Sequence, residues 1–373
     1  MTPKRAKTNT YQASPVNRRP EPSTDRKSES DFFTSSRPAK AYANCMKAFL
    51  VDISAFQLWF GDQGVVRTGA PLARVDDFAF ATSDRADLPL NQIKQLGLCG
   101  QLHVAVPSHS MRHHQSGITA HVLHSPAPYS FVRLSKDVYV ESPGATAIRM
   151  AARLKQGELA VMLNQLLSGY RISNGVIVRA RPLTTKTQLV NRLTASKGER
   201  GVKIVRSALA YAVPDTASPA EAQVAALLTL PAKWGGKGLP LPEANAAIPL
   251  HDPLAISEQG KEGCRKTTLR YADFLWRTWN LILEYDSDAF HASKDRLGLD
   301  SARRAELQRE GFSVITLTNH QLSSVEDFSV VTDALLAKMN RADRTARIEN
   351  YGNIEKALRK QVFSFDPNRI GMG

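Results

Sequence analysis

The sequence contains few cysteines and no long apolar run. Cys45, Cys99 and Cys264 are widely separated and form neither a disulfide framework nor a zinc-ligand spacing. We therefore expect a reducing compartment. The best apolar run, residues 46–60, is interrupted by polar residues and is too short to span a bilayer, and no secretory signal precedes it. These absences predict a cytoplasmic protein without a membrane partner.

The charge is strongly positive and unevenly distributed. Lys and Arg together number 49 and Asp and Glu 35, a formal net charge of +14. Residues 1–40 hold nine basic and four acidic residues (+5), and residues 171–210 hold nine and one (+8), so the rest of the chain nets only +1. Such a local excess of positive charge favours a polyanionic partner, and nucleic acid is favoured over a membrane surface.

The first two segments give little indication of chemistry. Residues 1–40 are rich in Pro, Ser, Thr and charge, which predicts a disordered basic tail; it is either a solubilising leader or a loose DNA-binding arm. Residues 41–170 predict a small α/β domain of unknown role. Within it, residues 102–106 and 138–140 are expected as strands, and Ala145–Leu167 as one helix that ends at Gly169.

Six of the nine histidines fall in this second segment. Imidazole is a common ligand of transition metals. The spacing matches no zinc signature, however, and small and turn-forming residues surround the histidines, so we predict ordinary strand and loop residues here rather than a metal site. The six are His103, His109, His113, His114, His121 and His124.

Residues 171–215 are interpreted as a basic helical connector. Two helices are expected, Leu183–Leu193 and Arg200–Tyr211, separated by a Ser-Lys-Gly break. The connector is either a solvated linker or a surface that contacts DNA phosphates. The candidate DNA-binding residues are Lys186, Arg192, Lys197, Arg200, Lys203 and Arg206.

The segment from Ser218 onward carries more specific patterns. Ser218, Pro219 and Glu221 match the N-cap, N1 and N3 positions of a capped helix. Apolar residues follow Glu221 at +3, +4 and +7, so its side chain also points inward, where an unpaired carboxylate is costly. Glu221 is therefore either a cap or an accessory catalytic residue.

Three strands are expected next: residues 245–250, Thr268–Trp276 and Leu281–Asp286. Side chains alternate along a strand, so Glu284 and Asp286 lie on one face, roughly 7 Å apart. If the hairpin closes symmetrically at Thr278-Trp279, paired residue numbers sum to 557 and Asp273 faces Glu284. A slip of one residue would separate the two acids.

Three converging carboxylates repel one another unless a cation binds between them. Asp273, Glu284 and Asp286 are hard oxygen ligands that suit Mg²⁺ or Mn²⁺. A metal ion there could activate water and neutralise charge on a phosphodiester. The alternative is a hairpin with acidic residues on its solvent face, although Asp and Glu are poor strand formers.

These residues resemble the PD-(D/E)XK restriction-endonuclease superfamily, and in particular the branch related to very-short-patch-repair endonucleases. The region from about residue 45 to 210 is faintly similar to abortive-infection antitoxins. The matching motifs are Ser218-x-x-Glu221, Asp273-Phe274, Glu284-x-Asp286, His291 and Asp300-x-x-Arg303-x-x-x-Leu307-x-x-x-Gly311-x-x-Val314.

The resemblance implies roles for individual residues. Asp273 matches the acid that bridges metal ions, Glu284 the second ligand, and Glu221 the acid of the first helix. Most of the superfamily has Lys where this chain has Asp286, although the closer branch also carries an acid there. His291 is either a proton donor or acceptor or a surface histidine. Arg303 or Arg304 either contacts a phosphate or carboxylate or is solvated.

The predicted class is α/β, with a mixed-sheet, restriction-endonuclease-like core of order α-β-β-β-α-β in residues 216–345. A crossover through residues 300–310 leads to a strand at 312–317, and residues 346–373 form a helical tail. The expected function is a Mg²⁺- or Mn²⁺-dependent DNA endonuclease or nickase. The alternatives are a non-catalytic DNA-binding regulator and a toxin–antitoxin component that acts mainly through a protein partner. Besides DNA, the candidate partners are another protein and a second copy of this chain in a homodimer.

Overall fold

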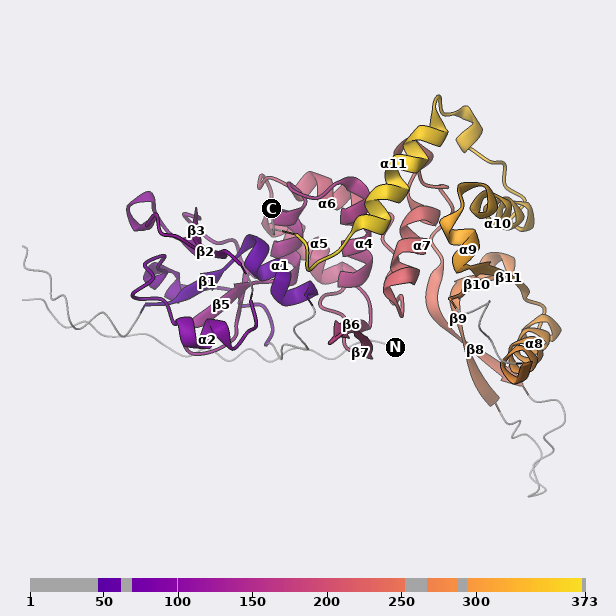
Figure 1. Ribbon diagram of the computed structural model, residues 1–373, viewed down its shortest axis with the longest axis horizontal. Coiled ribbons are helices and arrows are strands. Elements are labelled where there is room, and N and C mark those ends of the chain that lie inside the picture. Colours follow the sequence, from indigo (N-terminus) through magenta and orange to yellow (C-terminus); the bar gives the residue numbers. More distant parts are fainter. Residues whose placement is uncertain (1–45, 62–68, 99, 252–266, 288–293, 371–373) are drawn as a thin grey trace, which may run out of the picture. The chain divides into compact units, whose positions relative to one another are not determined.

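The computed structural model describes residues 46–61, 69–98, 100–251, 267–287 and 294–370. The predicted tail, residues 1–40, and all three cysteines lie outside these ranges. The described residues form helices and mixed sheets, which confirms the α/β class (Figure 1). No helix in them is long and apolar enough to cross a membrane.

The N-terminal part contains a five-stranded sheet of order β3-β2-β1-β5-β4. β1 pairs in parallel with β5 and antiparallel with β2, and β2 pairs in parallel with β3. The two strands that we predict here are therefore confirmed as β2 and β5. The strands are β1 (Ala48–Leu50), β2 (Leu102–Val106), β3 (Ile118–Val122), β4 (Phe131–Arg133) and β5 (Val138–Glu141).

Alternation along β1 separates two apolar cores. Ala48 and Leu50 pack in one cluster with Trp59 of helix α1 (Asp52–Phe60), whereas Phe49 packs in another with Phe131. Both faces of the sheet are therefore covered. The short helices of this part are η1 (Asp76–Phe80), α2 (Leu90–Lys94) and η2 (His109–Met111).

The helix that we predict over Ala145–Leu167 is in fact two helices, α3 (Pro143–Met150) and α4 (Gln156–Leu166). The side chain of Glu158 accepts a hydrogen bond from the backbone N–H of Lys155, at 2.7 Å. This is the N3-to-N-cap contact of a capping box, and it starts a new helix inside a continuous apolar pattern.

The connector is helical only in part, because it begins with a β-hairpin of β6 (Tyr170–Ser173) and β7 (Val176–Arg179). Asn174 and Gly175 both have positive φ, 50° and 74°, as a two-residue hairpin turn requires. The two predicted helices follow as α5 (Lys186–Ala195) and α6 (Val202–Leu209), with bounds shifted by a few residues.

The C-terminal part has the predicted order of helix, three strands, helix and strand, and its sheet has the order β11-β10-β9-β8. β10 pairs in parallel with β11, and α8 connects the two strands along the chain. Gly311, at φ 86°, follows the end of this helix. The elements are α7 (Pro219–Thr229), η3 (Ala232–Trp234), β8 (Glu243–His251), β9 (Thr267–Trp276), η4 (Arg277–Trp279), β10 (Leu281–Asp286), α8 (Lys294–Arg309) and β11 (Ser313–Thr318).

The two faces of this sheet contribute to different cores. Leu275 and Ile282 pack in a small cluster with Leu307 of α8. Phe274 and Leu283 belong instead to the larger core that includes α7 residues. Helix α8 thus covers one face, and Glu284, two residues after Ile282 on β10, is directed to that face.

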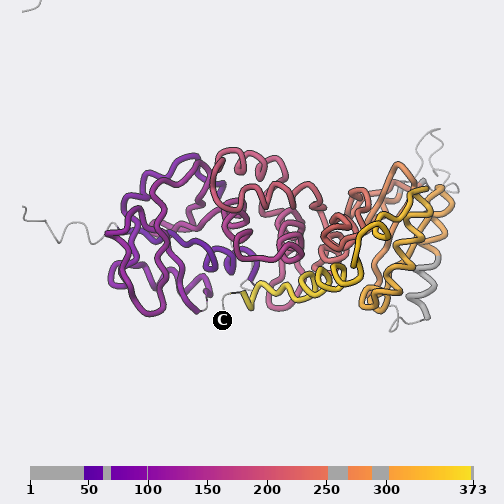
Figure 2. Tube along the Cα trace, turned by 90° about the horizontal axis from the view of Figure 1, so that it is seen from above, coloured from indigo at the N-terminus to yellow at the C-terminus, as the bar shows by residue number. Residues whose placement is uncertain are grey.

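The chain ends in α9 (Asn319–Ser323), α10 (Val325–Lys338), η5 (Thr345–Arg347) and α11 (Tyr351–Ser364). The predicted helix at Glu355–Phe363 is confirmed. α11 contacts both α4 and α7, and the yellow helix runs along them in both views (Figures 1 and 2). Leu358 and Val362 are fully buried there, so this helix is part of the core.

Candidate functional site

The hairpin of β9 and β10 has the predicted register over its three ladder pairs, but the ladder ends before the predicted pair of Asp273 and Glu284. The pairs Trp276–Leu281, Leu275–Ile282 and Phe274–Leu283 all sum to 557. Beyond them the carboxylate of Asp273 replaces a ladder partner: its Oδ2 accepts the backbone N–H of Tyr285 at 2.8 Å. Asp273 therefore lies beside the β10 segment that carries Glu284.

The ladder on the other side of Asp273 is interrupted as well. Pairs Ala244–Phe274 and Ala246–Ala272 flank its position on β8. The residue between them, Asn245, has a φ of 47°, in the left-handed region that asparagine tolerates better than most residues. Regular strand pairing is thus lost on both sides of Asp273. Its carboxylate is therefore free to interact with groups from neighbouring elements.

Helix α8 supplies a cation to the second acid. Nη2 of Arg303 lies 3.0 Å from Oε1 of Glu284, and the two side chains are 37% and 19% exposed. Arg303 also donates to the backbone carbonyl of Tyr271. Arg304 instead donates to Oγ1 of Thr316, at 2.9 Å. Of the two arginines that the sequence singles out, only Arg303 contacts a site carboxylate among the described residues.

Glu221 takes part in the N-terminal cap of α7, which is one of the two roles that the sequence leaves open. Ser218 accepts the N–H of Glu221 and donates its hydroxyl to Oε1 at 2.9 Å, while the N–H of Ala217 donates to Oε2 at 2.7 Å. Burial, followed in weight by the negative charge of Asp273, raises the pKa of Glu221 to about 7 against the lowering effect of these donors. The acid that caps α7 is therefore also close enough to Asp273 to interact with it electrostatically.

Asp273 and Asp286 are both partly buried in the C-terminal sheet. Burial raises the pKa of Asp273, although the Tyr285 N–H and the charge of Arg303 act in the opposite direction. Asp286 ends β10, opposite Thr318 of β11, and is partly buried. By alternation it shares a strand face with Glu284. His291 lies outside the described residues.

The predicted DNA-binding residues of the connector fall into two groups. Lys197, Arg200, Lys203 and Arg206 are exposed, and Lys186 is partly exposed, with a pKa lowered by burial. Arg192 is only 6% exposed and donates to Oγ of Ser130 at 3.0 Å. Because a phosphate contact needs an accessible guanidinium, Arg192 contributes to packing in this conformation.

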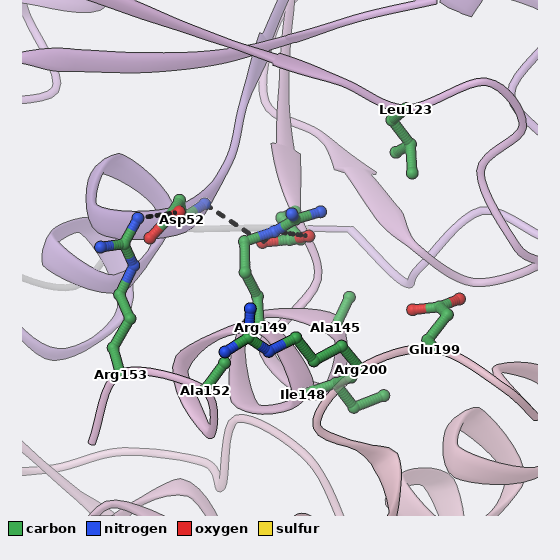
Figure 3. A pocket seen from close by; sticks show the side chains of 10 residues that line it. Asp52, Leu123, Ala145, Ile148, Arg149, Ala152, Arg153, Glu199 and Arg200 are labelled. Carbon is green, nitrogen blue, oxygen red and sulfur yellow. Dashed lines mark hydrogen bonds and ion pairs between the residues drawn. The ribbon is translucent and has the colours of Figure 1, made fainter.

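A second cluster of polar residues lies in the N-terminal part, and sequence reasoning missed it. Asp52, His103 and His121 each offer a ligand atom within 4.8 Å of the others. They come from α1, β2 and β3, so no local spacing in the sequence could have identified the group. Asp52 also lines a cavity of about 540 Å³ with Glu141, Arg149 and Arg153 (Figure 3).

Comparison with known proteins gives no functional description. No family model matches the chain, and no solved structure does. Two proteins of Mycobacterium tuberculosis, from strains CDC 1551 / Oshkosh and ATCC 25618 / H37Rv and both described as uncharacterized, are each 24% identical over 176 residues. The match covers 47% of this chain and 53% of each relative, so the chain spans about half the length of these proteins.

Proposed function

We propose that this protein is a Mg²⁺-dependent DNA endonuclease or nickase of the PD-(D/E)XK type, acting in bacterial defence or DNA repair. The observation that carries the proposal is Asp273, held by the Tyr285 N–H beside Glu284 where the hairpin ladder ends. The α-β-β-β-α-β order of the surrounding elements supports the same core.

The acidic residues fit a hard divalent cation. Asp273, Glu284 and Asp286 would hold Mg²⁺ or Mn²⁺ through carboxylate oxygens, which these ions prefer. Desolvation makes an uncompensated charge on Asp273 unfavourable, as its raised pKa indicates, and a bound cation would offset that penalty. When bound, the ion lowers the pKa of a water molecule and neutralises phosphodiester charge.

Arg303 supplies the positive charge that is missing because residue 286 is Asp rather than Lys. Its guanidinium is always charged, and it reaches Glu284 from α8. Arginine also pairs with phosphate in a two-pronged geometry. We infer that Arg303 orients Glu284 and stabilises negative charge on the scissile phosphate, the part that the superfamily's Lys plays elsewhere.

Glu221 is suited to move a proton. An acid with a pKa of about 7 is populated in both forms near neutral pH. Its carboxyl group is held by Ser218 and Ala217, and Asp273 influences its charge. These contacts support the role of accessory acid or base beside the metal ligands.

The exposed cations of the connector would hold the DNA backbone. Lys197, Arg200, Lys203 and Arg206 lie on or between α5 and α6 with accessible side chains. Contacts of this kind are independent of base sequence and weaken as salt rises.

The test is plasmid cleavage. Purified protein is incubated with supercoiled DNA in Mg²⁺, Mn²⁺ or EDTA, beside Asp273→Asn, Glu284→Gln and Arg303→Ala. We expect nicking that needs a metal ion and falls by roughly 100-fold or more in the two acid variants. Glu310→Gln, an exposed acid at the end of α8, serves as the control and retains activity.

A DNA-binding regulator on the same fold is the second candidate. The acid at Asp286 and the exposed cations of the connector favour it. Retarded migration of DNA without cleavage in either metal would support this function and contradict the nuclease.

A further inference from the structure

Two histidines and one aspartate converge at the edge of the N-terminal sheet. His121 of β3 is paired with Ala105 of β2, so it shares a sheet face with His103, two residues before Ala105. Asp52 is the first residue of α1 and is separated from the end of β1 only by Val51. The N–H of Val51 bonds to the carbonyl of His103 at 3.0 Å, which holds the aspartate next to the histidines.

The two imidazoles face each other through ring nitrogens. Nδ1 of His103 lies 2.9 Å from Nε2 of His121. One nitrogen must donate and the other accept at this distance, so the facing atoms share a single proton. Nε2 of His121 is also 3.7 Å from Oδ2 of Asp52. Two nitrogens and a carboxylate oxygen are thus directed at one another.

The second oxygen of Asp52 provides an independent indication of a ligand. Asp52 is 3% exposed, and Arg153 donates to its Oδ2 at 2.7 Å. Oδ1 is buried and has no hydrogen-bond partner among the described residues. A buried carboxylate oxygen without a donor is unfavourable, which makes a missing partner the simplest account.

We propose that Asp52, His103 and His121 form a binding site for a divalent transition-metal ion of the Zn²⁺ class. Tetrahedral Zn²⁺ with bonds of about 2.0–2.1 Å places neighbouring ligand atoms about 3.3 Å apart. The 2.9 Å and 3.7 Å separations lie on either side of that value. The ion takes the place of the proton between the imidazoles, and the ring that carried this proton becomes protonated at its other nitrogen instead, so that both rings stay neutral and each offers a lone pair to the ion.

The donor set separates this site from the carboxylate site of the C-terminal sheet. Imidazole suits zinc and its neighbours, whereas Mg²⁺ prefers oxygen alone. Two cations lie near the cluster: Arg153 pairs with Asp52 and is 45% exposed, so solvent screens its charge, and Arg149 pairs with Glu141 at 2.8 Å. Asp52 and Arg153 meet at the cavity (Figure 3), from which water can supply a fourth ligand.

The test uses full-length, tag-free protein stripped with EDTA. All variants carry Asp273→Asn, so that the carboxylate site contributes equally. Zn²⁺ is titrated against a chromophoric chelator, and Co²⁺ is added separately to report coordination by its visible absorption. His121→Asn removes a ligand, while His124→Asn removes an exposed histidine three residues away and is the matched control.

We expect His121→Asn to weaken Zn²⁺ binding by roughly tenfold or more and to abolish the Co²⁺ absorption, with His124→Asn unchanged. Asp52→Asn, which preserves shape, should weaken binding in the same direction. Urea unfolding without metal verifies that each variant is folded. Equal affinities in the His121 and His124 variants, or no Zn²⁺ bound at micromolar concentration by the parent, would overturn the proposal.

Discussion

At the scale of single residues, Glu221 combines a structural and an electrostatic role. Its carboxyl group accepts from Ala217 and Ser218 as a helix cap, yet burial and Asp273 raise its pKa to about 7. The ordinary value is 4.5. Since the protonated acid is the form that the folded state prefers, the charge on Glu221 opposes folding.

The stability of the protein should therefore fall as pH rises from about 4.5 to 7 through this group, with the full loss present above pH 7. In EDTA, Glu221→Gln should remove this dependence of stability on pH. Between pH 5 and 8, the free energy of unfolding of the variant should therefore rise by up to about 3 kcal/mol relative to that of the wild type. Chemical denaturation at several pH values measures the difference.

Ser218→Ala is the control for this measurement. It removes the hydroxyl cap, at a cost of about 1 kcal/mol, but leaves the acid in place, so the slope should remain. If the free energies of unfolding of the wild type and Glu221→Gln differ by the same amount at every pH from 5 to 8, the raised pKa of Glu221 is contradicted.

At the scale of elements, the start of α6 depends on a backbone that only glycine can supply. Gly201 is the N-cap, at φ 99°, and a Cβ there would lie 2.0 Å from the carbonyl oxygen of Ile148 on α3. The close approach of α3 and the end of the α5–α6 connection thus requires the absence of a side chain. Gly198 has nearly the same φ, 97°, but nothing lies within 4 Å of its added Cβ.

This pair separates backbone strain from contact. Gly198→Ala should destabilise the protein by about 1–2 kcal/mol, because only the left-handed conformation is penalised. Gly201→Ala adds a clash with a backbone atom and should cost more than that, roughly 3 kcal/mol or above. Urea midpoints of the two variants measure the difference, and equal losses would show that the α3 contact is not limiting.

The sequence predicts those elements that depend on near neighbours. The cap at Ser218, the helix end at Gly311 and the register of β9 with β10 follow from residues close in the chain. The Asn174-Gly175 pair is likewise a local signal of a hairpin turn, and the prediction of a helical connector does not include it.

Contacts between distant segments could not be predicted in the same way. Arg192 is buried against a distant part of the chain, where Ser130, 62 residues earlier, accepts its hydrogen bond. His103 and His121 meet Asp52 only after three elements have assembled. Arg303 is directed to Glu284 by the packing of α8 on the sheet. The position of Arg303 and Arg304 in the sequence does not show which of the two makes this contact.

At the scale of the whole molecule, one apolar core joins the connector helices to the C-terminal sheet. It contains Leu193 of α5, Val205 of α6, Leu283 of β10 and Leu358 of α11. An ion pair is buried beside it: Nζ of Lys237 lies 3.0 Å from Oε1 of Glu355, and the two side chains are only 7% and 4% exposed. This pair links the loop after η3 to α11.

Breaking this pair on one side should be more harmful than removing both charges. Lys237→Met leaves Glu355 buried without its cation, and we expect a loss of about 3–5 kcal/mol in the free energy of unfolding. Adding Glu355→Gln to Lys237→Met removes the stranded charge and should recover part of that loss. Urea unfolding of the two single variants and the double variant gives the coupling energy. If the losses of the single variants simply add, the two charges do not stabilise each other, and α11 is held by its apolar contacts alone.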